Sequence, residues 1–221
     1  RHSSHGAKVG FLLHICRRVD KTLYFDYFIL SKDRKGEFVQ TDEPVWRERQ
    51  INDCPKLRRA TDLWRSALST HLDGDPETAI KMYRISLSVR ETAEAYTYMA
   101  WAFSHYGDLD LAIRLCKQAI DVDPTFGNAY NDMGAYLVEA GLGPSAETWF
   151  QSAKVALRYQ TPQFPFLNLA RLYISWGRFV DAFQELTVAK VLAPDDKRIG
   201  ELITYVVVQQ QLAVEFSQEA K

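Results

Sequence analysis

Between positions 60 and 195, apolar residues recur with the spacing of amphipathic helices. One stripe follows the spacing i, i+3, i+4, i+7 and consists of Tyr96, Met99, Ala100 and Phe103. A second stripe consists of Leu109, Ala112, Ile113, Cys116 and Ile120. Gly107 and Asp108 separate the two stripes, and Pro124 ends the second because proline cannot continue a helix. This pattern predicts a pair of helices near 94–122, each with one apolar face.

The same arrangement recurs along the chain. Two later copies match the first pattern at eight positions each, and they consist of Tyr130, Met133, Gly134, Leu137, Gly141, Ala146, Phe150 and Ala153, and of Phe166, Leu169, Ala170, Tyr173, Gly177, Ala182, Leu186 and Ala189. A weaker upstream copy matches at Leu63, Ala67, Gly74, Ala79 and Tyr83, but not at Ser66, Thr70 and Ser86. The alanine that opens each second helix therefore recurs after 33, 34 and 36 residues.

A period near 34 residues with this order of large, small and aromatic positions resembles the tetratricopeptide repeat, whose pattern is W-x2-L-G-x2-Y, then A-x3-F, then P. The resemblance covers about residues 60–195. It implies a mainly α fold, a right-handed superhelix of about four helix pairs near 61–88, 94–122, 127–158 and 163–192. Two copies depart from the pattern: Arg158 replaces the proline of the third, with two extra residues before Gln163, and Glu91 replaces that of the first.

The chain beyond the repeats predicts a helix that caps the array. Its apolar stripe consists of Ile199, Leu202, Ile203, Val206 and Val207. Several glutamines, from Gln209 to Gln218, make the rest polar, as the solvent-facing end of a stacked array requires. We therefore expect residues 57–195 to form the array and residues 196–221 to form a capping helix.

Residues 1–56 have a different pattern, which favours strands and a connector. Thr22–Leu30 is rich in aromatic residues, and Glu37–Gln40 resumes a strand-like pattern after the charged turn Ser31–Gly36. This arrangement predicts a small β-hairpin, with Val9–His14 as a possible third strand. The stretch Thr41–Pro55 is polar and contains two prolines, so we expect a connector with room for a short helix.

Composition and charge narrow the classes of partner and compartment that this chain can have. The 27 basic and 28 acidic residues nearly cancel, and the clustered lysine and arginine that nucleic acid or an anionic membrane needs are missing. The apolar run Val9–Cys16 is too short to span a bilayer. Three cysteines without metal-like spacing predict free thiols in a reducing compartment, so we expect a cytoplasmic protein. The chain begins with Arg1 rather than methionine, which leaves open a targeting segment upstream.

Three groups of residues were weighed for chemistry. Gly141-Leu142-Gly143 lacks the third glycine and the preceding strand of a dinucleotide loop, so it predicts a turn between helices. His14 and Cys16 are too few to hold zinc. His71 and His105 have Asp73 and Asp108 close in sequence, but no nucleophile stands at a signalled position. We expect no catalysis, no cofactor and no metal site.

The tetratricopeptide resemblance implies a binding groove lined by the first helix of each pair. Carried over residue by residue, it marks Trp64, Leu68, Thr97, Tyr98, Trp101, Asn131, Asp132, Asn168 and Arg171. Trp64 and Trp101 are large aromatics where a solvated face would be polar, and such residues often dominate protein interfaces. The alternative is that the N-terminal segment or the last helix covers them. The positions that would clamp an Hsp70 or Hsp90 C-terminal tail carry no basic pair, so that ligand is not expected.

These observations predict a protein-interaction adaptor or scaffold that binds a peptide or a partner helix in its groove. Two alternatives stay open: a self-assembling structural module, and a recruiting domain cut from a larger enzyme. Small residues in the repeat, Gly134 among them, are expected where two helices touch.

Overall fold

The computed structural model describes residues 13–19, 22–28, 30–32, 38–40, 54–159 and 161–219. For residues before 54 it describes the backbone alone. The chain divides into two compact units, Arg1–Pro55 and Lys56–Lys221, and each is described by itself.

The described part of the first unit consists of two antiparallel strand pairs. Strand β1 (Leu13–Val19) pairs with β2 (Thr22–Phe28), and β3 (Leu30–Lys32) pairs with β4 (Phe38–Gln40). The sequence predicted a hairpin of 22–30 with 37–40, with Val9–His14 as a possible third strand. Only the last part of that segment pairs as predicted, whereas Thr22–Phe28 pairs with β1. Alternating aromatic residues indicate a strand but not its partner, and the two residues between β1 and β2 suit a tight hairpin.

From the sequence, His14 and Cys16 were considered as metal ligands. Their side chains lie outside the described part of the structure. Both residues belong to β1. All strands that the structure describes lie within the first 45 residues, as the sequence predicted.

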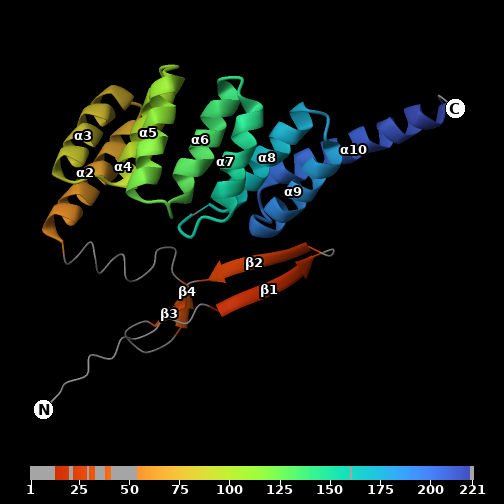
Figure 1. Cartoon of the computed structure of the whole chain (residues 1–221), viewed down its shortest axis with the longest axis horizontal. Helices are drawn as coiled ribbons and strands as arrows, with labels where there is room; N and C mark the ends of the chain where they lie inside the picture. The colour runs from red at the N-terminus through yellow and green to blue at the C-terminus, as the bar shows by residue number, and fades with distance from the viewer. Residues whose placement is uncertain are drawn as a thin grey trace, which may run out of the picture. The chain divides into compact units, whose positions relative to one another are not determined.

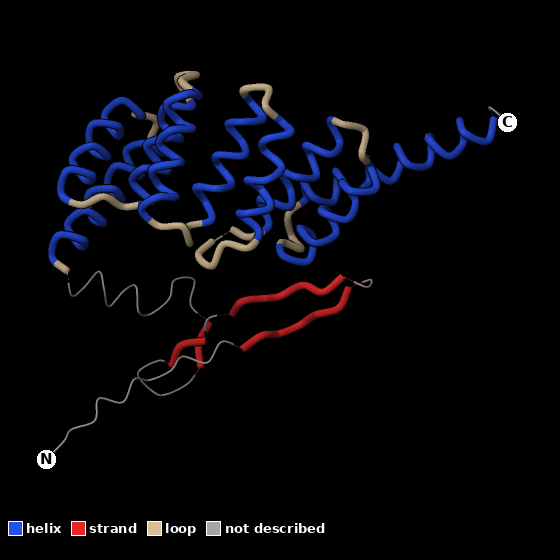
Figure 2. Tube along the Cα trace, in the orientation of Figure 1, coloured by secondary structure: helices blue, strands red, loops and turns tan. Residues whose placement is uncertain are grey.

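The described part of the second unit consists of nine α-helices, four pairs followed by a single helix (Figures 1 and 2). The pairs are α2 (Pro55–Leu72) with α3 (Pro76–Val89), α4 (Ala93–Ser104) with α5 (Leu109–Val122), α6 (Gly127–Glu139) with α7 (Gly143–Lys154), and α8 (Gln163–Ser175) with α9 (Phe179–Leu192). The single helix is α10 (Lys197–Glu219). The four predicted pairs are confirmed. Two bounds differ: α2 begins at Pro55, where proline is favoured in a first turn, and α7 ends at Lys154.

Short polar residues fix the starts of three helices. The side chain of Asp75 accepts a hydrogen bond from the Thr78 amide at 2.9 Å, and that of Asp108 accepts one from the Leu111 amide at 3.1 Å. Thr92 caps α4 in the same way, through the amide of Ala95 at 3.3 Å. Asp108 is therefore engaged at the start of α5 and is not aimed at His105.

The turn inside each helix pair contains a glycine with a left-handed backbone. These residues are Gly74, Gly107, Gly141 and Gly177, with φ between 71° and 93°. A side chain in this conformation crowds the following carbonyl oxygen, so glycine is the residue that fits. Gly141 therefore belongs to a turn, as the sequence predicted for the Gly141-Leu142-Gly143 stretch.

Replacing Gly107 with alanine is expected to lower the free energy of unfolding by about 1–2 kcal/mol, because the alanine would have to adopt that left-handed backbone. The matched control is Gly200→Ala, since Gly200 lies within α10 with no atom near the added methyl group. That control should be neutral or slightly stabilising, by up to about 1 kcal/mol. Urea unfolding measures both changes, and equal losses in the two variants would contradict the assignment of the turn.

The core follows the repeat positions. The alanines that open the second helices, Ala79, Ala112, Ala146 and Ala182, are completely buried. The large position four residues later is also buried, and it is occupied by Tyr83, Cys116, Phe150 and Leu186. Small residues therefore let paired helices approach, while the larger ones fill the space between them.

In the weak first copy, the polar residue that replaces an alanine has a hydrogen-bond partner. Ser86 stands where the other copies have alanine, and its side chain is completely buried. Its hydroxyl donates a hydrogen bond to the Ala60 carbonyl at 2.8 Å, which ties α3 to α2. A buried hydroxyl with a partner costs little, so the copy retains the repeat geometry.

The segment between α7 and α8 differs from the other connections. One isolated β-bridge pairs Phe126 with Arg158, through backbone hydrogen bonds from Gly127 to Arg158 and from Arg158 to Thr125, each 2.9 Å. The Arg158 side chain is buried and forms ion pairs of 2.8 Å with Glu94 and with Asp123. Arg158 thus replaces the expected proline with a connection to α4 and to the end of α5. The sequence showed that the pattern departs here but not what replaces it.

Candidate protein-binding groove

The predicted groove residues divide into two groups by burial. At one repeat position of the four first helices lie Trp64, Thr97, Asn131 and Leu167, all at 9% exposure or less. Helix α6 contacts both α4 and α8, so side chains at this position contribute to packing within the array. Trp64, Thr97 and Asn131 were predicted to line the groove, and their burial leaves them little surface for a partner.

The other predicted residues keep part of their surface exposed, and we name them together the groove surface. It consists of Leu68 on α2, Tyr98 and Trp101 on α4, Asp132 on α6, and Asn168 and Arg171 on α8. Arg171 is exposed and the other five are half-buried. Because they come from consecutive first helices, they form a continuous row of candidate contact residues.

Aromatic rings gather at the α2–α4 end of this row. The Trp101 ring lies 4.2 Å from that of His71 and 5.3 Å from that of His105, measured between centroids. Tyr98 contacts Trp64 in the same way at 5.6 Å. Burial, and then the nearby His105, lower the pKa of His71, so the imidazole beneath Trp101 is neutral at pH 7. Trp101 is therefore held against two rings of its own array while part of it faces solvent.

Amide and carboxylate groups occupy the middle of the row. The side-chain amide of Asn168 donates a hydrogen bond to the Asn131 carbonyl oxygen at 2.9 Å, and the Asn131 amide donates one to the Asp132 carboxylate at 3.2 Å. This chain of bonds joins α8 to α6 and fixes the orientation of all three side chains. It also leaves the carboxylate as the terminal acceptor.

Asp132 is partly enclosed by the array. Burial raises the pKa of its carboxyl to about 7. Burial also raises the pKa of Cys116, Tyr136 and Tyr159, and the proximity of Asp132 adds to each shift. Cys116, Tyr136 and Tyr159 are therefore uncharged at pH 7. Among the described residues, no lysine or arginine forms an ion pair with Asp132.

Comparison with protein-family models gives no match, and comparison with curated proteins gives none either. Solved structures do match. A PilF structure from Pseudomonas aeruginosa superposes with a TM-score of 0.68 at 17% identity, over 75% of each chain. The type IV pilus biogenesis factor PilW gives 0.59 at 19% identity, over 71% of this chain and 78% of that one. Cut9, from the APC/C heterotetramer Cut9–Hcn1, gives 0.58 at 18% identity, over 65% of this chain and 29% of that one.

The chain has the tetratricopeptide-repeat fold. The likeness to PilF spans three quarters of both chains, and the repeat positions that carry the pattern in the sequence are those that form the core. At these identities the comparison concerns the fold of the tetratricopeptide array. What the array binds has to be argued from its own residues.

Two observations bear on the candidate chemistry in the described part of the tetratricopeptide array. No group of three or more histidine, cysteine, aspartate or glutamate side chains there is placed to hold a metal ion. The rings of His71 and His105 contact each other, with 3.3 Å between Nε2 of one and Nδ1 of the other. Among the described residues, no helix has the length and apolar character that crossing a membrane requires.

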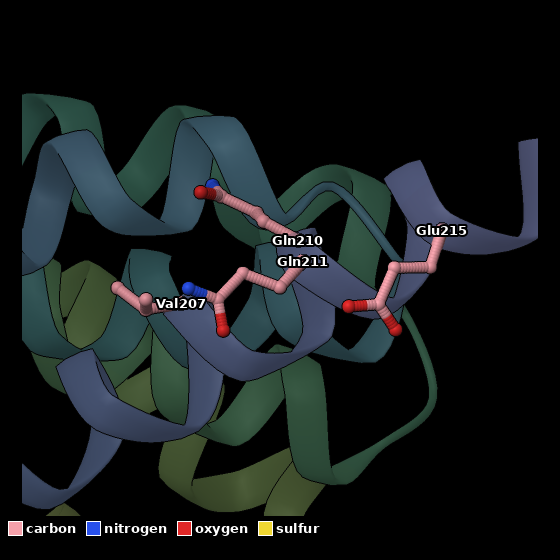
Figure 3. Close-up of a pocket in the computed structure, with 4 residues that line it drawn as sticks. All are labelled: Val207, Gln210, Gln211 and Glu215. Atoms are coloured by element: carbon pink, nitrogen blue, oxygen red, sulfur yellow. The ribbon is translucent and has the colours of Figure 1, made fainter. Parts of the chain in front are cut away.

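A pocket of about 620 Å³ lies along α10, outside the groove surface. Its described lining, Val207, Gln210, Gln211 and Glu215, comes from that one helix (Figure 3). Three of these four residues are polar and one of the three is charged, and the four together do not indicate a particular ligand.

Sequence reasoning missed two features of this site. The first is the partial burial of Asp132, which its place beside the core residue Met133 could have suggested. The second is the contact of Trp101 with His71, residues that are 30 positions apart. Only the repeat register relates these two residues, which lie on the first helices of neighbouring pairs, α2 and α4.

Proposed function

We propose that this chain is a protein-interaction module that binds an extended peptide or a partner helix on its groove surface and performs no chemistry itself. The observation that carries the proposal is the continuous row of half-buried residues on α4, α6 and α8. Aromatic and amide side chains in this row are oriented by neighbours within the array.

Pre-organisation supports this proposal. A partner that contacts Trp101 would not have to order a mobile side chain, because His71 and His105 already contact that ring. The hydrogen bonds of Asn131 and Asn168 hold the next part of the surface in the same way. Rigid aromatic residues flanked by oriented polar groups are typical of the few residues that dominate binding energy.

The proteins of similar fold are compatible with such a role. One of them, Cut9, is described in a heterotetramer with Hcn1, and PilW is described as a pilus biogenesis factor. The partner of this chain is not inferred from them, and the proposal rests on the row of groove residues.

The test is Trp101→Ala. Peptides are first selected from a short random library displayed on phage, with the full chain as bait, and their affinities are measured by fluorescence anisotropy. We expect the substitution to weaken binding by about 2 kcal/mol, roughly 30-fold in Kd, as truncation of a dominant interface residue does. Because Trp101 is half-buried, the melting temperature should change little.

The matched control is Trp176→Ala. Trp176 is 37% exposed and lies at the turn after α8, outside the groove surface, so its loss should leave affinity unchanged. If Trp101→Ala instead costs about 3–5 kcal/mol of stability and leaves affinity unaltered, the residue is part of the packing and the groove proposal is wrong.

A further inference from the structure

Asp132 occupies the middle of a column that runs across three first helices. Tyr98 on α4 and Asn168 on α8 stand at the same repeat position on either side of it. Packed helices lie about 8–10 Å apart, so a ligand that crosses the array passes an aromatic ring, a carboxylate and an amide in that order. The two ends of the surface therefore differ in the chemistry that they offer to a ligand.

Two hydrogen bonds beside this column run toward the carboxylate. Asn168 donates to Asn131, and Asn131 donates to Asp132. A carboxylate can accept about four hydrogen bonds, and the described residues supply one. Asp132 is half-buried, and neither of its oxygens is among the fully enclosed side-chain atoms that have no hydrogen-bond partner, so a ligand on the groove surface can supply further donors.

The array itself provides no counter-charge for this carboxylate among the described residues. Arg158, a buried cation of the described array, is engaged with Glu94 and Asp123. Lys154 is engaged with Glu185 at 2.9 Å. An enclosed carboxylate without a cation is costly, and the raised pKa of Asp132 reflects that cost.

The neighbouring groups favour a cation over other ligands. Among the described residues, Asp132 raises the pKa of Cys116 from α5, of Tyr136 from α6 itself and of Tyr159 from the α7–α8 segment, and all three are neutral at pH 7. The ring of Tyr98, which contacts Trp64, occupies the neighbouring position of the column on α4. Arg171, the exposed cation of the groove surface, lies beyond Asn168 on α8, so the cation of a ligand belongs on the α4–α6 side.

We infer that the groove surface recognises a segment that presents a lysine or arginine side chain to Asp132. This inference rests on the proposed function and adds the chemistry of the partner: a basic residue in the middle of the bound segment, next to an apolar or aromatic residue for Trp101. The groove would thus select a charge opposite to that of an acidic C-terminal tail.

The experiment is a comparative selection. The short random peptide library is panned on the full chain and, in parallel, on Asp132→Asn, which keeps the shape of the side chain and removes its charge. The matched control is Asp121→Asn, because Asp121 is an exposed acid on α5. We expect lysine and arginine to be enriched with the unmodified chain and with Asp121→Asn, and the enrichment to disappear with Asp132→Asn.

A synthetic copy of the most enriched basic peptide then tests the interaction directly. Its Kd should rise at least tenfold with Asp132→Asn. With the unmodified chain, binding should weaken about tenfold between pH 8 and pH 6, because the carboxyl is protonated below its pKa of about 7. In Asp132→Asn, the dependence of Kd on pH should be lost. If Asp132 had only a structural role, the substitution would not remove this dependence.

The stability of Asp132→Asn provides a check on folding. The folded-state pKa is raised above the unfolded value, so the ionised carboxyl destabilises the fold at high pH and the penalty disappears as the acid is protonated. The variant should therefore melt at a higher temperature than the unmodified chain at pH 8, with the difference lost near pH 4.

The outcomes separate this inference from the proposed function. If selected peptides lose affinity with Trp101→Ala but show no basic preference, or bind Asp132→Asn equally well, the inference is wrong and the groove proposal stands. If no peptide is selected, or if the selected peptides ignore Trp101, both are wrong.

Discussion

Replacing Arg158 with alanine is expected to lower the free energy of unfolding by about 3–5 kcal/mol, as the loss of one partner of a buried ion pair does. The guanidinium of Arg158 is 6% exposed and contacts two carboxylates at 2.8 Å, those of Glu94 and Asp123. It also lies 4.1 Å from the centroid of the Phe126 ring. The substitution would leave the Glu94 side chain, which is 8% exposed, without its cation.

The matched control is Arg178→Ala. Arg178 also pairs with a carboxylate, that of Asp181 at 2.7 Å, but its side chain is 44% exposed, so solvent screens the interaction. Its removal should cost no more than about 1 kcal/mol. Chemical denaturation measures both, and losses of similar size would contradict the structural role assigned to Arg158.

The same ion pairs predict sensitivity to acid. Burial alone would raise the pKa of Asp123, but hydrogen bonds from Thr125 and the nearby Arg158 lower it to about 2. Because the folded-state pKa lies below the unfolded value of 3.8, the stabilisation is complete above pH 4 and is lost as the pH falls toward 2. Arg158→Ala should therefore lose less stability than the unmodified chain over this range.

Replacing Gly134 with leucine is expected to lower the free energy of unfolding by about 3 kcal/mol, at the upper end for overpacked cores. A β-carbon at this position would already lie 2.6 Å from Cε1 of Phe150. The Phe150 ring is 1% exposed and is enclosed between α6 and α7, so it has little room to move. The structure confirms the sequence-based expectation that Gly134 lies where two helices touch.

The control for this change is Gly200→Leu. Gly200 also lies within a helix, but no atom is within 4 Å of an added β-carbon. The leucine should be tolerated there because helix propensity favours it over glycine. Thermal unfolding compares the two variants. An unchanged melting temperature for Gly134→Leu would place that residue on an open surface and would show that the repeat alignment is wrong.

The array could be predicted because its geometry repeats. Ala79, Ala112, Ala146 and Ala182 recur at nearly constant intervals, and each is buried where a helix pair closes. A stacked repeat contacts only its neighbours, so local spacing already contains most of the tertiary contacts. The same argument explains why the weak first copy, with Ser86 in place of alanine, still forms a helix pair.

Features that depend on contacts distant in sequence could not be predicted. Arg158 reaches Glu94 across 64 residues, and only the missing proline marked its position as unusual. In the groove, one step along a helix turns the side chain by about 100°, which is enough to separate the buried Asn131 from the half-buried Asp132. Helical spacing located the face, but the packing of α6 between α4 and α8 decides which residues remain accessible.

The connection made by Arg158 also bears on how the array comes apart. A stack of repeats opens by steps, and each step costs the energy of one junction between neighbours. The junction between the second and third copies carries two extra ion pairs and a β-bridge, so separation should begin at the ends of the stack and reach this junction last. Tyr98 and Asp132 lie on the two sides of that junction. The central part of the groove surface would therefore keep its geometry in partly opened states in which the outer helices have already separated.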